Sequence, residues 1–162
     1  MGTSHLVIGD AHAKPGVSND RFNWLGKLVV DRKPDVIIDM GDWADMPSLS
    51  SYDKGRKSFE GRRYKNDVKA AKEAYMRFET PIAMLNARRA NNKKKQYKPR
   101  KIKLVGNHEE RILRAQEAQP ELEGVIKLED IGHTKYGWET SPFLHPIAVD
   151  GVYYNHYFTI GS

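Results

Sequence analysis

The sequence contains no cysteine, and this absence restricts the kinds of site that the chain can build. No disulfide framework can hold the fold together, and no thiolate can serve as a nucleophile or as a metal ligand. A bound metal ion would therefore take its ligands from Asp, Glu, Asn and His side chains, which supply oxygen and imidazole nitrogen.

Long apolar runs are lacking as well. Hydrophobic residues make up 39% of the 162 residues and charged residues 30%, which is ordinary for a globular protein. No run approaches the roughly 18 apolar residues that a membrane span needs, and the apolar stretch near the N-terminus is too short for a signal peptide. We therefore expect a single domain over residues 1–162, located in the cytoplasm and without a membrane partner.

Acidic residues are the minority among the charged ones. The chain has 27 Lys and Arg against 21 Asp and Glu, which gives a net charge of +6. A basic balance favours polyanions such as nucleic acid as partners through non-specific electrostatics. Lysines crowd residues 93–103, for which a solvated, mobile loop is the favoured interpretation. The alternative is a tract that steers a nucleic-acid backbone toward the functional site.

Strand-like and helix-like patterns alternate along the first two thirds of the chain. Short apolar runs predict three buried strands: 6–8, 36–38 and 102–105. Apolar residues at helical spacing predict three helices: 18–33, 66–91 and 109–118, with a further helical turn at 122–128. Pro81 should kink or split the second helix. This alternation predicts an α/β fold with a parallel sheet.

The remaining segments have different characters. The polar, glycine-containing segment 48–64 predicts an irregular excursion over the functional site. Residues 143–158 are strand-like, and Asp150-Gly151 is the signature of a tight hairpin turn. His156 would lie on the second arm of that hairpin.

Each of the three predicted strands ends in a glycine that a potential metal ligand follows: Gly9-Asp10, Gly41-Asp42 and Gly106-Asn107. Because the carboxyl ends of parallel strands meet at one edge of a sheet, these side chains should converge. His12, His108 and His156 add imidazoles to the same region. Such ligands suit Mn, Fe, Zn, Co, Ni or Mg, and two such ions can activate a water and clamp a phosphate.

Four segments resemble, in order and in their position at strand ends, the first four sequence blocks of the calcineurin-like metallophosphoesterase superfamily: Gly9-Asp10-Ala11-His12, Gly41-Asp42-Trp43-Ala44-Asp45, Gly106-Asn107-His108-Glu109 and Asn155-His156. The resemblance covers residues 10–156 and is greatest to phage and bacterial members. It implies that the fold is an α/β/β/α sandwich. It also implies that the protein is located in the cytoplasm of a bacterium or of a virus-infected host cell. It also implies hydrolysis of a phosphoester by a metal-bound hydroxide at a centre of two divalent ions, with manganese expected first.

The resemblance also implies a metal ligand for each block. Asp10 and His12 would hold the first ion, Asp42 would bridge the two ions, and Asn107 and His156 would hold the second. Taken one at a time, these residues have plainer interpretations as turn or cap residues, or, for His156, as a core histidine.

His108 and Asp45 would form the catalytic pair. The imidazole would act on the leaving oxygen as a general acid or transition-state stabiliser, and the carboxylate would orient it. A solvent-facing turn carboxylate is the alternative for Asp45. Met46 stands where serine/threonine phosphatases carry a phosphate-binding arginine, which favours phosphoesterases of broader substrate class.

Four arginines could contact the substrate: Arg56, Arg62 and Arg63 in the excursion, and Arg111 in the third predicted helix. For Arg111 we favour a salt bridge on the helix surface. Glu109 and Glu110 should be first-turn helix acids that interact favourably with the helix dipole. Trp43 could stack on a substrate ring or pack in the core. Three histidines are expected to be structural: His5, His133 and His145.

One block of the family has no counterpart in the sequence. The family ends with a Gly-His-x-His block that gives each metal one more imidazole, whereas His156 is the last histidine of this chain. We therefore expect a C-terminally incomplete domain, or a further polypeptide segment that supplies the missing histidines.

Three functions remain open at this point. Positive charge favours a phosphodiesterase or nuclease. A phosphomonoesterase acting on phosphoproteins or small phosphates is the nearest alternative. A non-catalytic nucleic-acid-binding fragment with an incomplete metal site is the third.

Overall fold

The computed structural model describes residues 2–158. Its strands and helices follow in the order β1 (His5–Ile8), α1 (Asp20–Arg32), β2 (Val36–Asp39), α2 (Tyr64–Asn91), β3 (Arg100–Leu104), α3 (Glu110–Ala118), β4 (Glu139–Ser141), β5 (Ile147–Val149) and β6 (Val152–Tyr154). Short 3-10 turns lie in the connections: Pro47–Leu49, Lys57–Phe59, Pro120–Leu122, Leu128–Ile131 and His133–Tyr136. None of the helices in the described part of the chain is long and apolar enough to cross a membrane.

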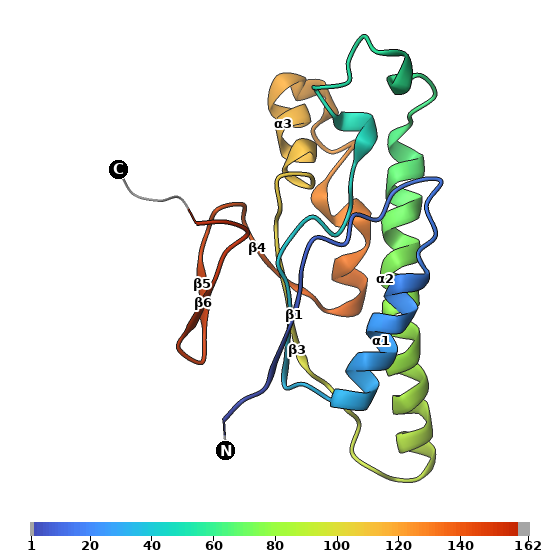
Figure 1. Ribbon diagram of the computed structural model, residues 1–162, viewed down its shortest axis with the longest axis vertical. Helices are drawn as coiled ribbons and strands as arrows, with labels where there is room; N and C mark the ends of the chain where they lie inside the picture. Colours follow the sequence, from blue (N-terminus) through green and yellow to red (C-terminus); the bar gives the residue numbers. More distant parts are fainter. Residues whose placement is uncertain (1, 159–162) are drawn as a thin grey trace.

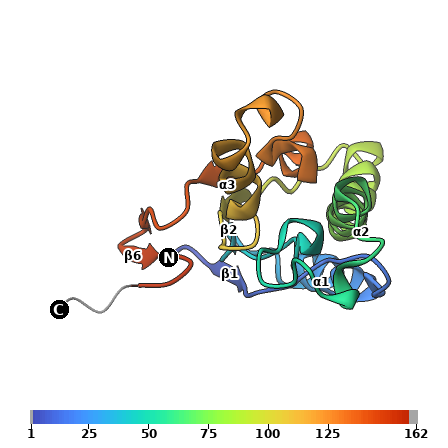
Figure 2. The same ribbon diagram turned by 90° about the horizontal axis from the view of Figure 1, so that it is seen from above.

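The first four strands form one parallel sheet in the order β1-β2-β3-β4. In its register, Ile8 pairs with Asp39, and Asp39 pairs with Lys103. Because every connection moves one strand further in the same direction, right-handed crossovers bring the connecting helices to one face of the sheet. Figures 1 and 2 show α1 and α2 on that face. The predicted α/β class with a parallel sheet is therefore confirmed.

The β5–β6 hairpin covers the opposite face of the sheet (Figure 2). The strands are antiparallel, and both turn residues, Asp150 and Gly151, have positive φ angles of 50° and 81°, as a tight primed turn requires. Val149 and Tyr154 of the hairpin pack in a small core on strands β2 and β3. The predicted hairpin turn is therefore confirmed.

The larger core lies between the sheet and the helices, and Trp43 lies buried at its centre. Its ring stacks on Tyr75 at a centroid distance of 4.4 Å and an interplanar angle of 10°, and it also contacts Phe22, Phe78 and Trp138. The side chain has no exposed surface, so of the two interpretations of Trp43 the structure supports core packing.

Helix α2 runs without interruption through Pro81, so the predicted split is wrong. A proline removes one N–H, which leaves the carbonyl oxygen four residues earlier, that of Arg77, without its helical partner. Asn23 Nδ2 of α1 donates to this oxygen at 3.5 Å. At Gly26 of α1, a β-carbon would collide with the backbone of Phe78 and lie 3.1 Å from Pro81 Cγ. Close packing against α1 therefore holds the helix together at the proline.

The last third of the chain differs most from the sequence prediction. Strand β4 was not predicted, because Glu139–Ser141 has no apolar residue and owes its strand conformation to pairing with β3. The strand-like segment 143–158 is reduced to β5 and β6. The helical turn predicted at 122–128 is replaced by two 3-10 turns on either side of Gly124, whose φ is 80°.

Candidate metal centre

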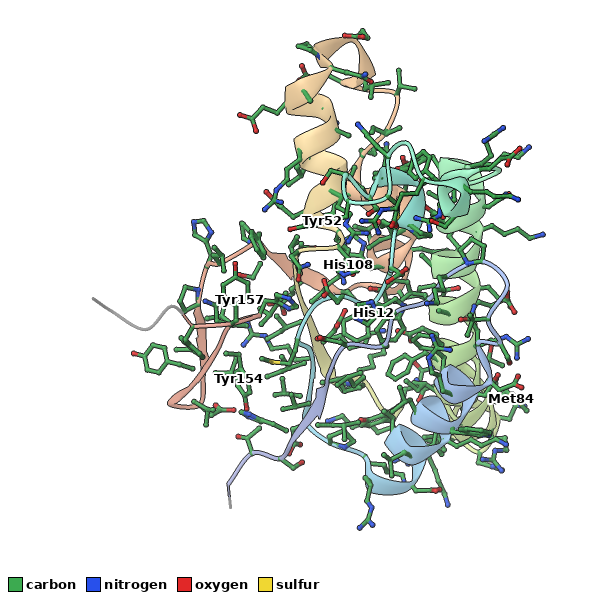
Figure 3. All side chains as sticks on the ribbon, turned by 45° about the horizontal axis from the view of Figure 1, so that its top comes forward. His12, Tyr52, Met84, His108, Tyr154 and Tyr157 are labelled. Carbon is green, nitrogen blue, oxygen red and sulfur yellow. The ribbon has the colours of Figure 1, made fainter. Side chains whose placement is uncertain are left out.

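The loops that follow β1, β2 and β3 meet beyond the carboxyl ends of these strands. The first two loops are joined by backbone hydrogen bonds, from His12 N to Asp42 O (2.9 Å) and from Ala13 N to Trp43 O (2.7 Å). The third loop joins them through His108 N, which donates to Asp42 Oδ1 (2.9 Å). Figure 3 shows His12 and His108 next to each other, and their rings lie edge to face at 4.6 Å.

Asp42 lies at the middle of this cluster. Its side chain is buried, and its Oδ2 atom lies 3.9 Å from His12 Nε2, 3.9 Å from His108 Nε2 and 3.6 Å from His156 Nε2. Burial raises the pKa of Asp42 against the opposing hydrogen bond from the His108 amide. Three imidazoles from three separate segments thus turn the same ring nitrogen toward one carboxylate oxygen.

The other nitrogen of each ring is already engaged. His12 Nδ1 donates to Asp45 Oδ1 (2.8 Å), and His108 Nδ1 donates to the backbone oxygen of Asp45 (2.7 Å). His156 Nδ1 donates to the backbone oxygen of Met40 (2.7 Å). A carbonyl oxygen can only accept, so the Nδ1 atoms of His108 and His156 must carry hydrogen. In the neutral rings, each Nε2 is then left with its lone pair facing the cluster.

Asp45 serves two histidines rather than one. Besides its bond to His12, its Oδ1 atom lies 3.2 Å from His108 Nδ1. Burial alone would raise the pKa of Asp45, but the hydrogen bonds with His108 and His12 outweigh it and lower the pKa to about 2. Burial alone would lower the pKa of His108, and the same contacts with Asp45 raise it. The carboxylate is therefore ionised and fixes both rings.

Two groups of three side chains have potential ligand atoms within 4.8 Å of one another: Asp10, Asp42 and His156, and His12, Asp45 and His108. In the second group, hydrogen bonds account for the contacts of Asp45, so we regard it as an orienting residue of the cluster. In the first group, Asp10 lies with Asp42 and His156, whereas the sequence prediction pairs it with His12. Asn107 Oδ1 lies 2.9 Å from His156 Nε2, within hydrogen-bond distance, so these two predicted ligands are neighbours.

Two glycines allow the loops to approach so closely. A β-carbon on Gly41, whose φ is 99°, would lie 2.7 Å from His156 Nδ1 and from the backbone of Gly106. A β-carbon on Gly106 would collide with the carboxylate and amide of Asp42. Gly41 is therefore restricted to glycine by its local conformation as well as by the neighbouring loop, and Gly106 is restricted by the neighbouring loop.

Glu109 immediately precedes α3, close to the predicted first turn, but its side chain lies beneath the cluster, where it has contacts that the prediction of a helix acid did not include. Its side chain is fully buried and accepts backbone hydrogen bonds from Asp42 (2.9 Å), Ala44 (3.0 Å) and Gly106 (3.1 Å). These donors belong to the loops after β2 and β3. A single carboxylate therefore holds both loops together.

Lys103 supplies the positive charge for this buried carboxylate. Its Nζ atom lies 2.9 Å from Glu109 Oε1 and 2.9 Å from Asp39 Oδ2, and the side chain has no exposed surface. Burial alone would raise the pKa of Glu109, but Lys103 outweighs it and lowers the pKa. Asp39, the second carboxylate on the same ammonium, has its pKa raised to about 6 by burial. Lys103 therefore does not belong to the solvated run that we predicted at 93–103.

A hollow of about 570 Å³ opens beside His108. Its lining includes Arg62, Arg63 and Arg111, whereas Arg56, the other arginine predicted to contact substrate, is not part of it. Arg62 is paired with Asp53 at 2.7 Å. The hollow therefore lies between the excursion over the site and the catalytic pair predicted from the sequence.

Arg111 lines this hollow and makes no ion pair with a carboxylate of the described residues, so the predicted surface salt bridge is wrong. It donates to the carbonyl oxygens of Asp45 (3.0 Å) and Met46 (3.3 Å), and its Nη2 atom lies 3.5 Å from His108 Nε2. Met46 itself is fully buried. The guanidinium of Arg111 is therefore the cation next to His108.

Three contributors to the site were not predicted from the sequence. Arg21 donates to the backbone oxygens of Ala11 (2.9 Å and 2.7 Å) and His12 (2.9 Å), and so fixes the first loop. The carbonyl of Met40 and the Lys103–Glu109 pair are the other two. The lysine in the apolar strand β3 was the one available signal, because a charge at a buried strand position needs a partner.

A comparison of the chain with protein-family models, with curated proteins and with solved structures finds no match in any of the three. The geometry of the cluster is therefore the basis of the functional proposal.

The substitution Glu109→Gln should destabilise the fold by about 3–5 kcal/mol, because it removes one charge of a buried pair and replaces a hydrogen-bond acceptor by a donor. The free energy of unfolding from urea denaturation measures the effect. Glu117→Gln, on the exposed side of the same helix, is the matched control and should change stability by less than about 0.5 kcal/mol. Equal effects of the two substitutions would contradict the role of Glu109.

Proposed function

We propose that this chain is a metal-dependent phosphoester hydrolase whose centre is the cluster around Asp42. We propose further that its fold is the α/β/β/α sandwich of calcineurin-like metallophosphoesterases, with the β5–β6 hairpin in the second sheet layer. The position of the hairpin on the sheet face opposite α1 and α2 supports this assignment.

One observation carries the proposal: the groups that face one another in the cluster are acceptors. The Nδ1 atoms of His12 and His156 donate to protein oxygens, so each of these rings, when neutral, presents a lone pair at Nε2. These lone pairs face a carboxylate oxygen, and Asn107 adds an amide oxygen. Acceptors that face one another repel unless a metal ion or a proton lies between them, and a metal ion is the partner that we propose here. An imidazole whose far nitrogen donates to an oxygen is also the usual state of a metal-binding histidine.

The donor set suits two divalent ions. Asp10, His12, Asp42, Asn107 and His156 would hold them, and Asp10 lies on the same side of the cluster as His156. Mixed carboxylate, amide and imidazole ligands favour manganese, with Fe, Zn, Ni, Co or Mg as alternatives. Such ions, when bound, supply Lewis acidity toward a phosphoryl oxygen and toward water.

His108 is the residue that would donate a proton to the leaving oxygen. Its Nδ1 atom is held by Asp45, and its raised pKa increases the protonated fraction near neutral pH. The guanidinium of Arg111, 3.5 Å from the same ring, would bind the negative charge of the phosphoryl group. The adjoining hollow of about 570 Å³ would receive the organic part of the leaving group.

The first test combines metal binding and turnover. We expect about two Mn²⁺ per chain by isothermal titration calorimetry, and hydrolysis of bis(p-nitrophenyl) phosphate that EDTA abolishes. Asp42→Asn should reduce both, because the charge at the middle of the cluster is lost, whereas Asp31→Asn, an exposed control on α1, should change neither. If the chain folds but neither binds Mn²⁺ nor hydrolyses the diester, the hydrolase proposal is wrong, and the non-catalytic nucleic-acid-binding fragment is the function that remains.

The second test concerns the substrate. The hollow of about 570 Å³ beside His108 leaves room for a second ester group, which favours phosphodiesters, including nucleic acid. We expect kcat/KM for bis(p-nitrophenyl) phosphate to exceed that for p-nitrophenyl phosphate. A preference for the monoester would replace the phosphodiesterase assignment by that of a phosphomonoesterase.

The third test separates His108 from the metal ligands. His108→Asn should lower kcat by about 10²–10⁴-fold while Mn²⁺ affinity stays within a few-fold of the original, because the ring acts on the leaving group. Activity of the unaltered enzyme should fall as the pH rises through the raised pKa of His108, above the ordinary value of 6.5. His145→Asn, at an exposed position, is the control. Loss of Mn²⁺ binding in the His108 variant would make this residue a ligand.

A further inference from the structure

The positive charge of the chain is concentrated in one stretch. Residues 80–108 contain nine Lys and Arg and no Asp or Glu. The other 133 residues contain 18 Lys and Arg against 21 Asp and Glu, so they carry a net charge of −3. The net charge of +6 is therefore produced by this stretch alone.

Three of these nine cations are neutralised inside the fold. Arg100 pairs with Glu139 (2.8 Å), Lys101 pairs with Glu79 (2.7 Å), and Lys103 is the buried ammonium beneath the metal cluster. The other six form what we call the basic end: Arg88, Arg89, Lys93, Lys94, Lys95 and Lys98. Among residues 2–158, none of these six has a carboxylate within ion-pair distance.

The basic end lies far from the candidate metal centre. It consists of the last turn of α2 and the loop before β3, at the amino ends of the parallel strands, whereas the metal cluster lies beyond their carboxyl ends (Figure 1). Helix α2 has 28 residues, which corresponds to a length of about 42 Å, and begins beside the hollow at His108. Figure 3 shows Met84, near the basic end, at the edge of the molecule and away from His12 and His108, which lie near its middle. These lysines therefore do not form a tract next to the candidate metal centre.

The loop that carries the lysines is anchored. Asn86 accepts a hydrogen bond from the amide of Tyr97 (2.7 Å) and donates one to its carbonyl oxygen (2.8 Å). Tyr97 Oη donates to Pro34 O (2.6 Å), and Arg89 Nε donates to Lys95 O (2.6 Å). The backbone that presents the cations is therefore held in place, so fewer conformations are lost when a ligand binds.

A second helix adds charge to the same place. Helix α1 ends at Arg32, and Lys33 caps it. Lys33, Arg89, Lys95 and Lys98 surround a hollow of about 500 Å³ between the ends of α1 and α2. Asp35 is the one carboxylate in its lining, and it accepts hydrogen bonds from the amide and hydroxyl of Ser4.

Helix dipoles explain only part of this arrangement. A cation or two in the last turn of a helix is stabilising, and Arg32 and Arg88 meet that need. Further unpaired cations at the same end repel one another and destabilise the compact state. Bound polyanion would remove that repulsion.

We propose that the basic end binds the phosphodiester backbone of a nucleic acid. The cations extend over the ends of two helices and the loop between α2 and β3. Cations spread in this way can contact several phosphates of one chain at the same time, which favours a nucleic-acid backbone over a single phosphate group. An anionic membrane surface is disfavoured, since Met84, one turn before Arg88 on α2, is a single exposed large hydrophobic side chain beside the basic end, and the described residues 86–98 add none that could insert into lipid. This surface is independent of the hydrolytic site and does not rest on its assignment.

The test compares two triple charge reversals that both take the net charge from +6 to 0. Lys93→Glu with Lys94→Glu and Lys95→Glu alters the basic end. Lys69→Glu with Lys72→Glu and Lys135→Glu alters exposed lysines outside it. Fluorescence anisotropy with labelled DNA of about 20 base pairs, and with single strands of the same length, gives the dissociation constant across about 50–200 mM salt.

We expect the basic-end variant to bind at least about tenfold more weakly than the unaltered chain near 100 mM salt, and its slope of log K against log salt to be shallower by about two to three. The control variant should lose less than about threefold. Equal losses in both variants, or no binding by the unaltered chain, would overturn the proposal. Binding to phosphatidylserine vesicles without binding to DNA would also overturn it, in favour of a membrane.

The same variants keep this proposal distinct from the hydrolase proposal. Circular dichroism melting checks that they fold, and hydrolysis of bis(p-nitrophenyl) phosphate with Mn²⁺ should be unchanged in the basic-end variant. If no variant hydrolyses the diester but DNA binding depends on the basic end, the hydrolase proposal fails and this one stands.

Discussion

The candidate metal centre depends on one buried contact, the carboxylate of Glu109 on the ammonium of Lys103. A carboxylate without exposed surface would take up a proton unless a cation stood beside it, and a protonated carboxyl group is a poorer acceptor. With Lys103 at 2.9 Å, the carboxylate of Glu109 stays ionised and accepts three backbone N–H groups. These N–H groups belong to two loops, so the buried carboxylate of Glu109 fixes the distance between the loops.

The sheet supplies the other half of the construction. Parallel strands in sequence order bring three loops to one edge, and the glycines at positions 41 and 106 let two of them touch. Asp42 is then fixed by its own amide, which donates to Glu109, and by the amide of His108, which donates to its carboxylate. The hairpin on the other face brings His156 to the same carboxylate oxygen. Residues 116 positions apart, Met40 and His156, thereby share a hydrogen bond.

Local patterns predicted the parts of this structure that depend on local sequence. The strands β1, β2 and β3, the three helices and the Asp150-Gly151 turn follow from short-range signals, and the residues after each strand converge because parallel strands require it. Register and burial are not local. From the sequence alone, Glu109 resembles a helix acid and Lys103 resembles part of a lysine run. The buried charge cluster that includes both becomes evident only when the register of the sheet pairs Asp39 with Lys103. Strand β4 escaped prediction for the same reason, since only its partner makes it a strand.

The polarity of α2 relates the two ends of the molecule. Its N-terminus, with the positive end of the helix dipole, lies beside the hollow at His108, where a phosphate would bind. Its C-terminus, with the negative end, carries the unpaired Arg and Lys side chains of the basic end. The dipole thus favours an anion at the first end and tolerates crowded cations at the second. Since the two ends of α2 are about 42 Å apart, a duplex held by the basic end would have to extend over about 12 base pairs, at 3.4 Å per pair, to reach the hollow at the other end of the helix. The proposed polyanion surface and the proposed hydrolytic site are therefore separate from each other, although one helix connects them.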